Sequence, residues 1–224
     1  MNNDFALRMK YGDNLIKRNY PAEFRAEGDS GLIVGVPIVF DTPTDIGGWF
    51  EETIVKGAIT EEVLRNDVGF YFNHDLNRMR IARSIIPIDK LGGMEFSVSD
   101  EKVIMRANAN RKRTDANDLY LGIEDGTIDG MSFMFRVAEE YWEDANTDYP
   151  KRFITKIDPV VEVSAVNYPA YKSTSINVAR GDLLTENDKA VIGQLRQRQQ
   201  AEADTEAKAK RELELLKLKA KILY

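Results

Sequence analysis

The sequence contains no cysteine and a single histidine, His74, among its 224 residues. Without cysteine the chain has no disulfide framework, no thiolate ligand for zinc and no thiol nucleophile. A metal site built from several imidazoles is improbable as well, so a metal would need carboxylate ligands alone. We therefore expect neither a metal nor a cofactor. The absence of cysteine is also typical of a protein that is made and used in the cytosol.

Long apolar runs and the common nucleotide motifs are missing too. No stretch approaches the roughly 20 apolar residues that cross a bilayer, and the polar start MNNDFALRMK lacks the apolar centre of a signal peptide. The dinucleotide pattern GxGxxG, the P-loop, HExxH and the calcium-binding loop do not occur. A net charge of −6 and a pI near 5.1 argue against broad nucleic-acid binding. The sequence predicts neither nucleic acid nor a membrane as a partner.

The composition, 43% hydrophobic and 30% charged, is that of a globular protein with room for one large domain and an appendage. It changes twice along the chain. Residues 1–30 are polar and mixed in charge, and we expect part of this lead to be loose. Residues 31–180 carry apolar runs separated by turn residues and form the expected main domain. Residues 181–224 form a tail of different character.

The main domain is predicted to be rich in β-strands. Short runs of Val, Ile, Phe and Tyr alternate there with Gly, Asp, Asn and Pro. The strand candidates are 31–40, 68–73, 80–87, 93–98, 102–108, 131–137, 152–157 and 160–167. Two segments, 57–66 and 114–128, have helical patterns instead. The predicted fold class is therefore α+β, dominated by strands, with a few helices.

The tail is predicted to be one helix. Beyond residue 181 it has no proline and is rich in Ala, Glu, Lys, Gln, Arg and Leu, which are strong helix formers. Leu213, Leu216, Ala220 and Leu223 have heptad-like spacing, although Glu206 and Glu202 interrupt the same register upstream. Two interpretations stay open: a solvated terminal helix, or a helix that docks on a partner or self-associates.

One serine is a candidate nucleophile. In the run IDGMSFMFRV, strand alternation places Met131, Phe133 and Phe135 on one face and Ser132 on the other. Met134 stands where the nucleophile elbow of an α/β-hydrolase needs a glycine, so that class is excluded. Taken alone, a serine in a strand is far more often structural than catalytic.

A carboxylate and the lone imidazole complete a possible triad. Glu162 interrupts a run of valines in DPVVEVSAVNYPAY, where an ionised group is costly unless it is paired. The alternative is that Glu162 faces solvent on an edge strand. Together, Ser132, His74 and Glu162 offer a serine to attack, an imidazole to take its proton and an acid to orient the imidazole.

These residues lie in segments that resemble a known family. GLIVGVPIVFDT, VKGAITEEV, FYFNHD with IARS, GMSFMFRV and EVSAVNYPAY occur in the order seen in the prohead maturation proteases of tailed bacteriophages. The resemblance spans roughly residues 30–178. It implies an assemblin-like, closed or partly closed β-barrel with surrounding helices, and a serine endopeptidase that trims scaffolding segments inside an assembling capsid.

The resemblance also implies roles and partners. His74 matches the family's catalytic histidine and Ser132 its nucleophile, while Glu162 lies in the block that supplies the acid; Asp75 and Asp158 are rival acids. The implied partners are the major capsid protein with its scaffolding segment, and in addition the portal. The chain could also act on itself by self-cleavage or bind further copies of itself in a homo-oligomer. The implied location is the prohead in the cytoplasm of a bacterial host.

Other functions stay open beside this one. A capsid-assembly scaffold or binding module that needs no triad is the main alternative, and a glycosidase with two carboxylates is a weaker one. The basic segment RKR, 111–113, could steer acidic substrate segments, although a solvated basic turn is the simpler account.

Overall fold

The computed structural model describes residues 10, 15–21, 24–28, 30–145, 147–167 and 186–222. The elements with assigned bounds follow in chain order. They are β1 (Leu15–Pro21), β2 (Phe24–Glu27), β3 (Leu32–Val39), β4 (Thr44–Ile46), β5 (Phe50–Ile54), α2 (Glu61–Leu64), β6 (Gly69–Phe72), β7 (Ala82–Arg83), β8 (Met94–Val98), β9 (Lys102–Asn108), α3 (Thr114–Glu124), β10 (Gly130–Glu143), β11 (Lys151–Val166) and α4 (Glu186–Ile222). The expected α+β fold rich in strands is confirmed.

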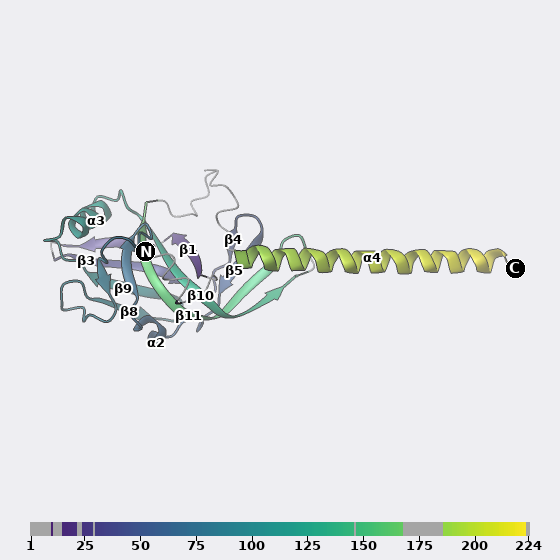
Figure 1. Ribbon diagram of the computed structural model, residues 1–224, viewed down its shortest axis with the longest axis horizontal. Helices are drawn as coiled ribbons and strands as arrows, with labels where there is room; N and C mark the ends of the chain where they lie inside the picture. Colours follow the sequence, from purple (N-terminus) through teal and green to yellow (C-terminus); the bar gives the residue numbers. More distant parts are fainter. Residues whose placement is uncertain are drawn as a thin grey trace.

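The strands form two sheets. A seven-stranded sheet has the order β1-β10-β11-β5-β4, with β6 paired to β11 and β7 paired to β6. A four-stranded sheet has the order β2-β3-β9-β8. Neither path returns to its first strand within the described residues, so no closed barrel is found among these strands. The family resemblance implies a closed or partly closed barrel, and the partly closed form stays a prediction. Figure 1 shows both sheets in one body, with α3 and α4 at opposite ends of it.

The long antiparallel ribbon of β10 and β11 is the centre of the larger sheet. At the end of this ribbon where Gly130 pairs with Val166, β11 has β10 on one side and β6 on the other. This half of β11 is therefore not at an edge of the sheet. Met131, Phe133 and Phe135 point into the main hydrophobic core, and the rings of the two phenylalanines stack 4.4 Å apart. The face predicted for these three side chains is therefore confirmed, and Ser132 lies on the opposite face.

Several elements differ from the sequence prediction. The candidates 152–157 and 160–167 are one strand, β11, which runs through Pro159. The register between β10 and β11 shifts between Met134 and Val137, opposite this proline. Such an irregularity accommodates Pro159, because a proline has no N–H to donate to the neighbouring strand. The helix expected over 57–66 is confined to α2, which begins after the N-cap Thr60.

The N-terminal lead contributes two strands. β1 pairs along its whole length with β10, and β2 pairs with β3. Residues 15–21 and 24–27 thus belong to the sheets rather than to a loose lead. Their polar sequence reflects edge positions, where one side of each strand faces away from the sheet.

The tail forms a 37-residue helix, α4, which projects from the body as a long rod (Figure 1). From Gln194 to Glu212 every residue whose exposure is described is exposed. None of the described helices has the length and apolar character that a membrane span requires. The side chains of Leu213, Leu216, Ala220 and Leu223, on which the docking interpretation depended, lie outside the described residues.

The first turns of α4 pack against the sheets. Asp188 is 1% exposed and Ile192 is 8% exposed. Ile192 joins Ile46 and Phe50 in a second apolar cluster that includes Trp49 and Trp142. The Arg196 guanidinium lies 5.0 Å from the Trp49 ring, a cation–π contact. Residues 188, 192 and 196 are four apart and share one face of the helix, so a single short stripe anchors it.

Candidate active site

The candidate histidine lies in a strained turn directly after β6. Asn73 and His74 both have positive φ angles, 51° and 58°, which are uncommon for residues other than glycine. Two backbone contacts hold this turn on the end of β11: the N–H of Asn73 donates to the Ala165 carbonyl at 2.8 Å, and the N–H of Asn167 donates to Asn73 Oδ1 at 3.1 Å. Strain of this kind is found at functional sites.

The carboxylate of Glu162 is buried and paired with His74. Glu162 is 0% exposed, and its Oε1 lies 2.5 Å from His74 Nδ1. The alternative that Glu162 faces solvent from an edge strand is therefore wrong. With Glu162 ionised, this hydrogen bond requires the histidine proton on Nδ1, which leaves Nε2 as the acceptor of the ring.

Ser132 lies on the neighbouring strand and on the same face as Glu162. It is 0% exposed and stands directly opposite Ser164 in the β10–β11 register, while Met134 stands opposite Glu162. Its hydroxyl donates to the carbonyl of Arg18 on β1 at 3.1 Å. Among the described side chains, Ser132 and His74 share no hydrogen bond. The structure thus brings the three candidates to one region on one face of the sheet. His74 and Glu162 are bonded to each other, whereas Ser132 is bonded to the Arg18 carbonyl.

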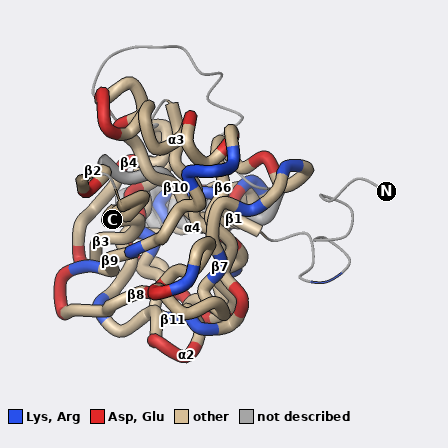
Figure 2. Tube along the Cα trace, turned by 90° about the vertical axis from the view of Figure 1, so that its left-hand side faces the viewer, with Lys and Arg blue, Asp and Glu red and all other residues tan. Residues whose placement is uncertain are grey.

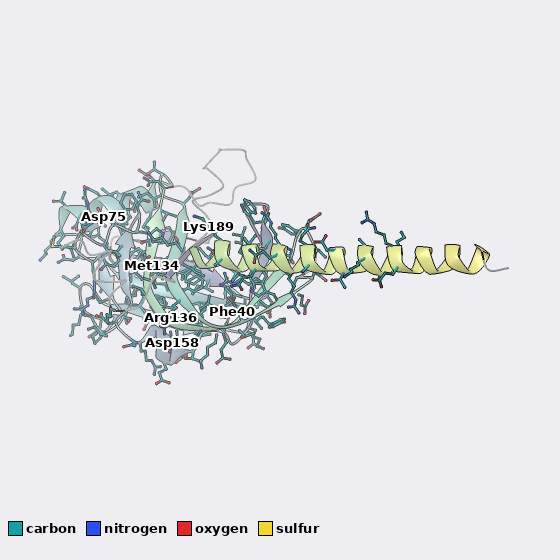
Figure 3. All side chains as sticks on the ribbon, turned by 45° about the vertical axis from the view of Figure 1, so that its right-hand side comes forward. Phe40, Asp75, Met134, Arg136, Asp158 and Lys189 are labelled. Carbon is teal, nitrogen blue, oxygen red and sulfur yellow. The ribbon has the colours of Figure 1, made fainter. Side chains whose placement is uncertain are left out.

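Neither rival acid is bonded to the imidazole among the described contacts. Asp75 accepts hydrogen bonds from the Asn77 backbone at 3.1 Å and from Arg78 Nε at 3.2 Å. Asp158 is exposed, and its backbone carbonyl accepts from Arg136. Figure 3 shows Asp75 and Asp158 on well-separated parts of the body. Of the three acids considered, Glu162 is the one bonded to the histidine.

A charged cluster that the sequence analysis missed holds the segment after His74. Asp67, just before β6, accepts from Arg83 Nε at 2.9 Å and from Arg80 Nη1 at 3.1 Å. The hydrogen bonds from Arg83, with those from Arg80, hold the pKa of the Asp67 carboxyl below its ordinary value of 3.8. Arg80 Nε also donates to the Tyr71 hydroxyl at 2.9 Å. The sequence signal for this cluster is the short spacing between Arg80 and Arg83.

A second cluster that the sequence analysis missed is buried at the N-terminal end of α4, which we call the root of this helix. Arg18 Nε donates to Glu52 Oε1 at 2.7 Å, and Arg152 Nη1 donates to Asp188 Oδ1 at 2.8 Å and to Glu52 Oε2 at 3.1 Å. All four side chains are at most 3% exposed, and Glu140 also accepts from Arg152. We call these five residues the buried ionic cluster. It joins β1, β5, β10, β11 and α4 although its members are far apart in sequence.

The basic segment 111–113 is largely engaged within the molecule. Arg111 Nε donates to Asn117 Oδ1 at 3.1 Å, and its guanidinium lies 4.4 Å from the Tyr120 ring. Arg113 pairs with Asp115 and donates to the Arg80 carbonyl. In the view of Figure 2, basic and acidic stretches alternate over the body. These contacts give the segment a structural role in the loop before α3.

A buried carboxylate bonded to an imidazole is the acid–base pair that a serine nucleophile requires, and Ser132 lies on the next strand. The chain belongs to the family described as Caudovirus prohead serine protease, whose profile matches residues 20–188. It is 24% identical over 155 residues to the prohead protease of Enterobacteria phage HK97; the alignment covers 69% of this chain and 62% of that relative. No solved structure matches the chain.

Proposed function

We propose that the chain is a serine endopeptidase in which Ser132 is the nucleophile, His74 the general base and Glu162 the acid that orients His74. The observation that carries this proposal is the 2.5 Å contact between His74 Nδ1 and the buried Glu162, on the sheet face that also holds Ser132. A buried carboxylate on one ring nitrogen fixes the tautomer in which the other nitrogen can accept a proton.

The proposed reaction is peptide hydrolysis through an acyl ester on Ser132. Ser132 Oγ attacks the carbonyl carbon of the scissile peptide bond while its proton passes to His74 Nε2, and Glu162 stabilises the imidazolium that forms. The imidazolium then gives the proton to the leaving amine, which breaks the C–N bond and leaves an acyl ester on Ser132. Water, deprotonated by His74, hydrolyses that ester. To start, the Ser132 hydroxyl must exchange its bond to the Arg18 carbonyl for one to His74.

The substrate proposed is the major capsid protein, cut in its scaffolding segment as the prohead matures in the cytoplasm of a bacterial host. Family membership and the name of the HK97 relative support this substrate and location. The portal, the chain itself and further copies in a homo-oligomer are additional proposed contacts. An assemblin-like barrel is likewise proposed for the fold, supported by the family resemblance and by the bulges that bend β10.

The competing function is a capsid-assembly scaffold without catalysis, which the complete burial of Ser132 favours. Co-expression with the major capsid protein of the same phage, followed by intact mass measurement, separates the two. A peptidase shortens the capsid protein at defined bonds, and Ser132→Ala abolishes the shortening. A scaffold leaves every mass unchanged in both cases.

A further inference from the structure

A second serine, Ser164, lies between the candidate catalytic groups. It is 0% exposed and stands on β11 directly opposite Ser132, two residues after Glu162. On its other side the register places it opposite Tyr71 of β6, the strand that leads into the turn with His74. Side chains directly opposite in a sheet have Cβ atoms about 4.5–5.5 Å apart, so Ser164 adjoins Ser132 as well.

The Ser164 hydroxyl makes one bond to each of two groups of the proposed triad. Its Oγ donates to Glu162 Oε2 at 2.5 Å and accepts from the backbone N–H of His74 at 3.2 Å. We propose that Ser164 is a positioning residue for the peptidase reaction, which fixes the acid and the base relative to each other; this inference rests on the proposed function.

The carboxylate needs this partner because it is buried. Glu162 has both oxygens occupied, Oε1 by His74 Nδ1 and Oε2 by Ser164 Oγ. Two donors on opposite oxygens fix the rotation of the carboxylate about its last side-chain torsion, which is otherwise broad. Without the hydroxyl, Oε2 is a buried acceptor with no partner in the described structure, and the carboxylate is free to turn away from the imidazole.

The backbone of His74 needs the same hydroxyl. His74 lies in the left-handed region with φ 58°, directly after Asn73 with φ 51°, a conformation that costs energy unless its surroundings hold it. The bond from the His74 N–H to Ser164 Oγ supplies one such contact at the residue that carries the imidazole. One side chain therefore holds both the acid and the main chain of the base.

Ser164 is not itself suited to attack a peptide bond. Its hydroxyl proton is directed at Glu162 rather than at the imidazole, and its oxygen already accepts a backbone N–H. A nucleophile would have to break both bonds, whereas Ser132 has to break one, to the Arg18 carbonyl. The two serines thus differ in the size of the loss expected when each hydroxyl is removed.

The test compares Ser164→Ala, Ser164→Thr and Ser164→Cys with the wild type. The variant Ser84→Ala is the control, because Ser84 Oγ also accepts a backbone N–H, that of Val68 at 2.9 Å, at the opposite end of β6 from His74. For each protein, kcat and KM are measured on a peptide spanning a capsid cleavage site. The rate at which a fluorophosphonate labels Ser132 is measured by mass spectrometry, which reports activation of the nucleophile without substrate binding.

We expect Ser164→Ala to lower kcat and the labelling rate together by about 10- to 100-fold, the loss usual for residues that orient catalytic groups, with KM changed less than about twofold. Ser164→Thr keeps the hydroxyl and should recover most of this loss. Ser164→Cys keeps the size but is a weak hydrogen-bonding group, so it should resemble Ser164→Ala. This variant decides the matter if the alanine variant does not fold.

The proposal is overturned if folded Ser164→Ala or Ser164→Cys keeps wild-type kcat and labelling, or if Ser84→Ala shows the same loss. It is also overturned if Ser164→Ala loses about 10⁴-fold or more and the label is found on Ser164 in the wild type, since Ser164 would then be the nucleophile. Full activity of Ser132→Ala with labelling at neither serine would instead remove the proposed function.

Discussion

At the scale of single residues, Ser132 and His74 are the side chains whose loss should remove the proposed activity. We expect Ser132→Ala and His74→Ala each to lower the rate of capsid-protein cleavage by about 10⁴- to 10⁶-fold, because nucleophile and base act as one unit. Among the described residues Ser132 makes one side-chain hydrogen bond, to the Arg18 carbonyl, so its alanine variant should fold normally. Cleavage assays with thermal unfolding check both points, and wild-type cleavage by Ser132→Ala would eliminate the serine mechanism.

The acid should be less sensitive than the nucleophile. Glu162→Gln keeps the shape but removes the charge that stabilises the imidazolium, so the rate should fall substantially yet less than in Ser132→Ala. Asp75→Asn is the matched control, since Asp75 is bonded to Asn77 and Arg78 and should give nearly wild-type rates. If Asp75→Asn proves the more damaging of the two, the acid has been assigned wrongly while the peptidase proposal stands.

The residue pattern predicted part of this site. A carboxylate among valines must be paired, and the lone imidazole was a natural partner, so the contact between Glu162 and His74 could be expected. The part played by Ser164 could not, because a serine in a strand has no signature apart from its neighbours. Likewise, nothing in the sequence pairs Arg18 with Glu52 or Arg152 with Asp188, since only the sheet order brings these residues together.

At the scale of elements, the loop from β6 to β7 depends on the charge of Asp67. Its folded pKa lies below the ordinary 3.8, so its ion pairs stabilise the fold above that pH and lose their effect as the pH falls through the folded value. Asp67→Asn, which tolerates the positive φ of this position, should lower the free energy of unfolding by about 1 kcal/mol at neutral pH. Denaturation curves between pH 7 and pH 3 should show the two proteins converging at the acid end; a gap independent of pH would contradict the assignment.

Helix α4 should depend on one buried charge at its root. Asp188→Ala leaves Arg152 and Arg18 short of a partner in a site that excludes water, and breaking such a pair costs about 3–5 kcal/mol. Asp204→Ala is the control, because Asp204 is exposed on the same helix and bonded only to Gln200 among the contacts described. We expect the free energy of unfolding of Asp204→Ala to differ from that of the wild type by less than about 0.5 kcal/mol. Equal urea midpoints for the two variants would show that the root of α4 does not contribute to stability.

Element prediction succeeded where alternation was strong and failed where other signals competed. The apolar runs of β3, β6, β8 and β9 were found close to their bounds. The sequence analysis predicted two strands in place of β11, because a proline such as Pro159 usually ends a strand in the middle of a sheet. β1 and β2 were missed because their polar sequences suit edge strands, and β4 and β5 because they are short and contain acids.

At the scale of the whole molecule, the structure divides the tail into an anchored root and an exposed arm. A chain that ends after Gln200 keeps Asp188, Ile192 and Arg196, so we expect unchanged cleavage of a short peptide. If the arm recruits the enzyme to its substrate, packaging into proheads should fall in this chain. A chain that ends after Asp182 loses the root too and should unfold more readily. Equal packaging of the Gln200 chain and the full-length chain would defeat the recruitment idea.

The buried ionic cluster has a consequence for any cut between Asn167 and Glu186. Breaking the main chain there removes the covalent connection but leaves Asp188 in its salt bridge with Arg152 and leaves Ile192 in its apolar cluster with Ile46 and Phe50. The two fragments should therefore behave as a heterodimer made from one polypeptide: two bands on a denaturing gel and a single mass in native mass spectrometry. The shorter fragment should be released by Asp188→Ala and not by Asp204→Ala. A helix in this state would act as a tightly bound subunit of the protein, held without a covalent link.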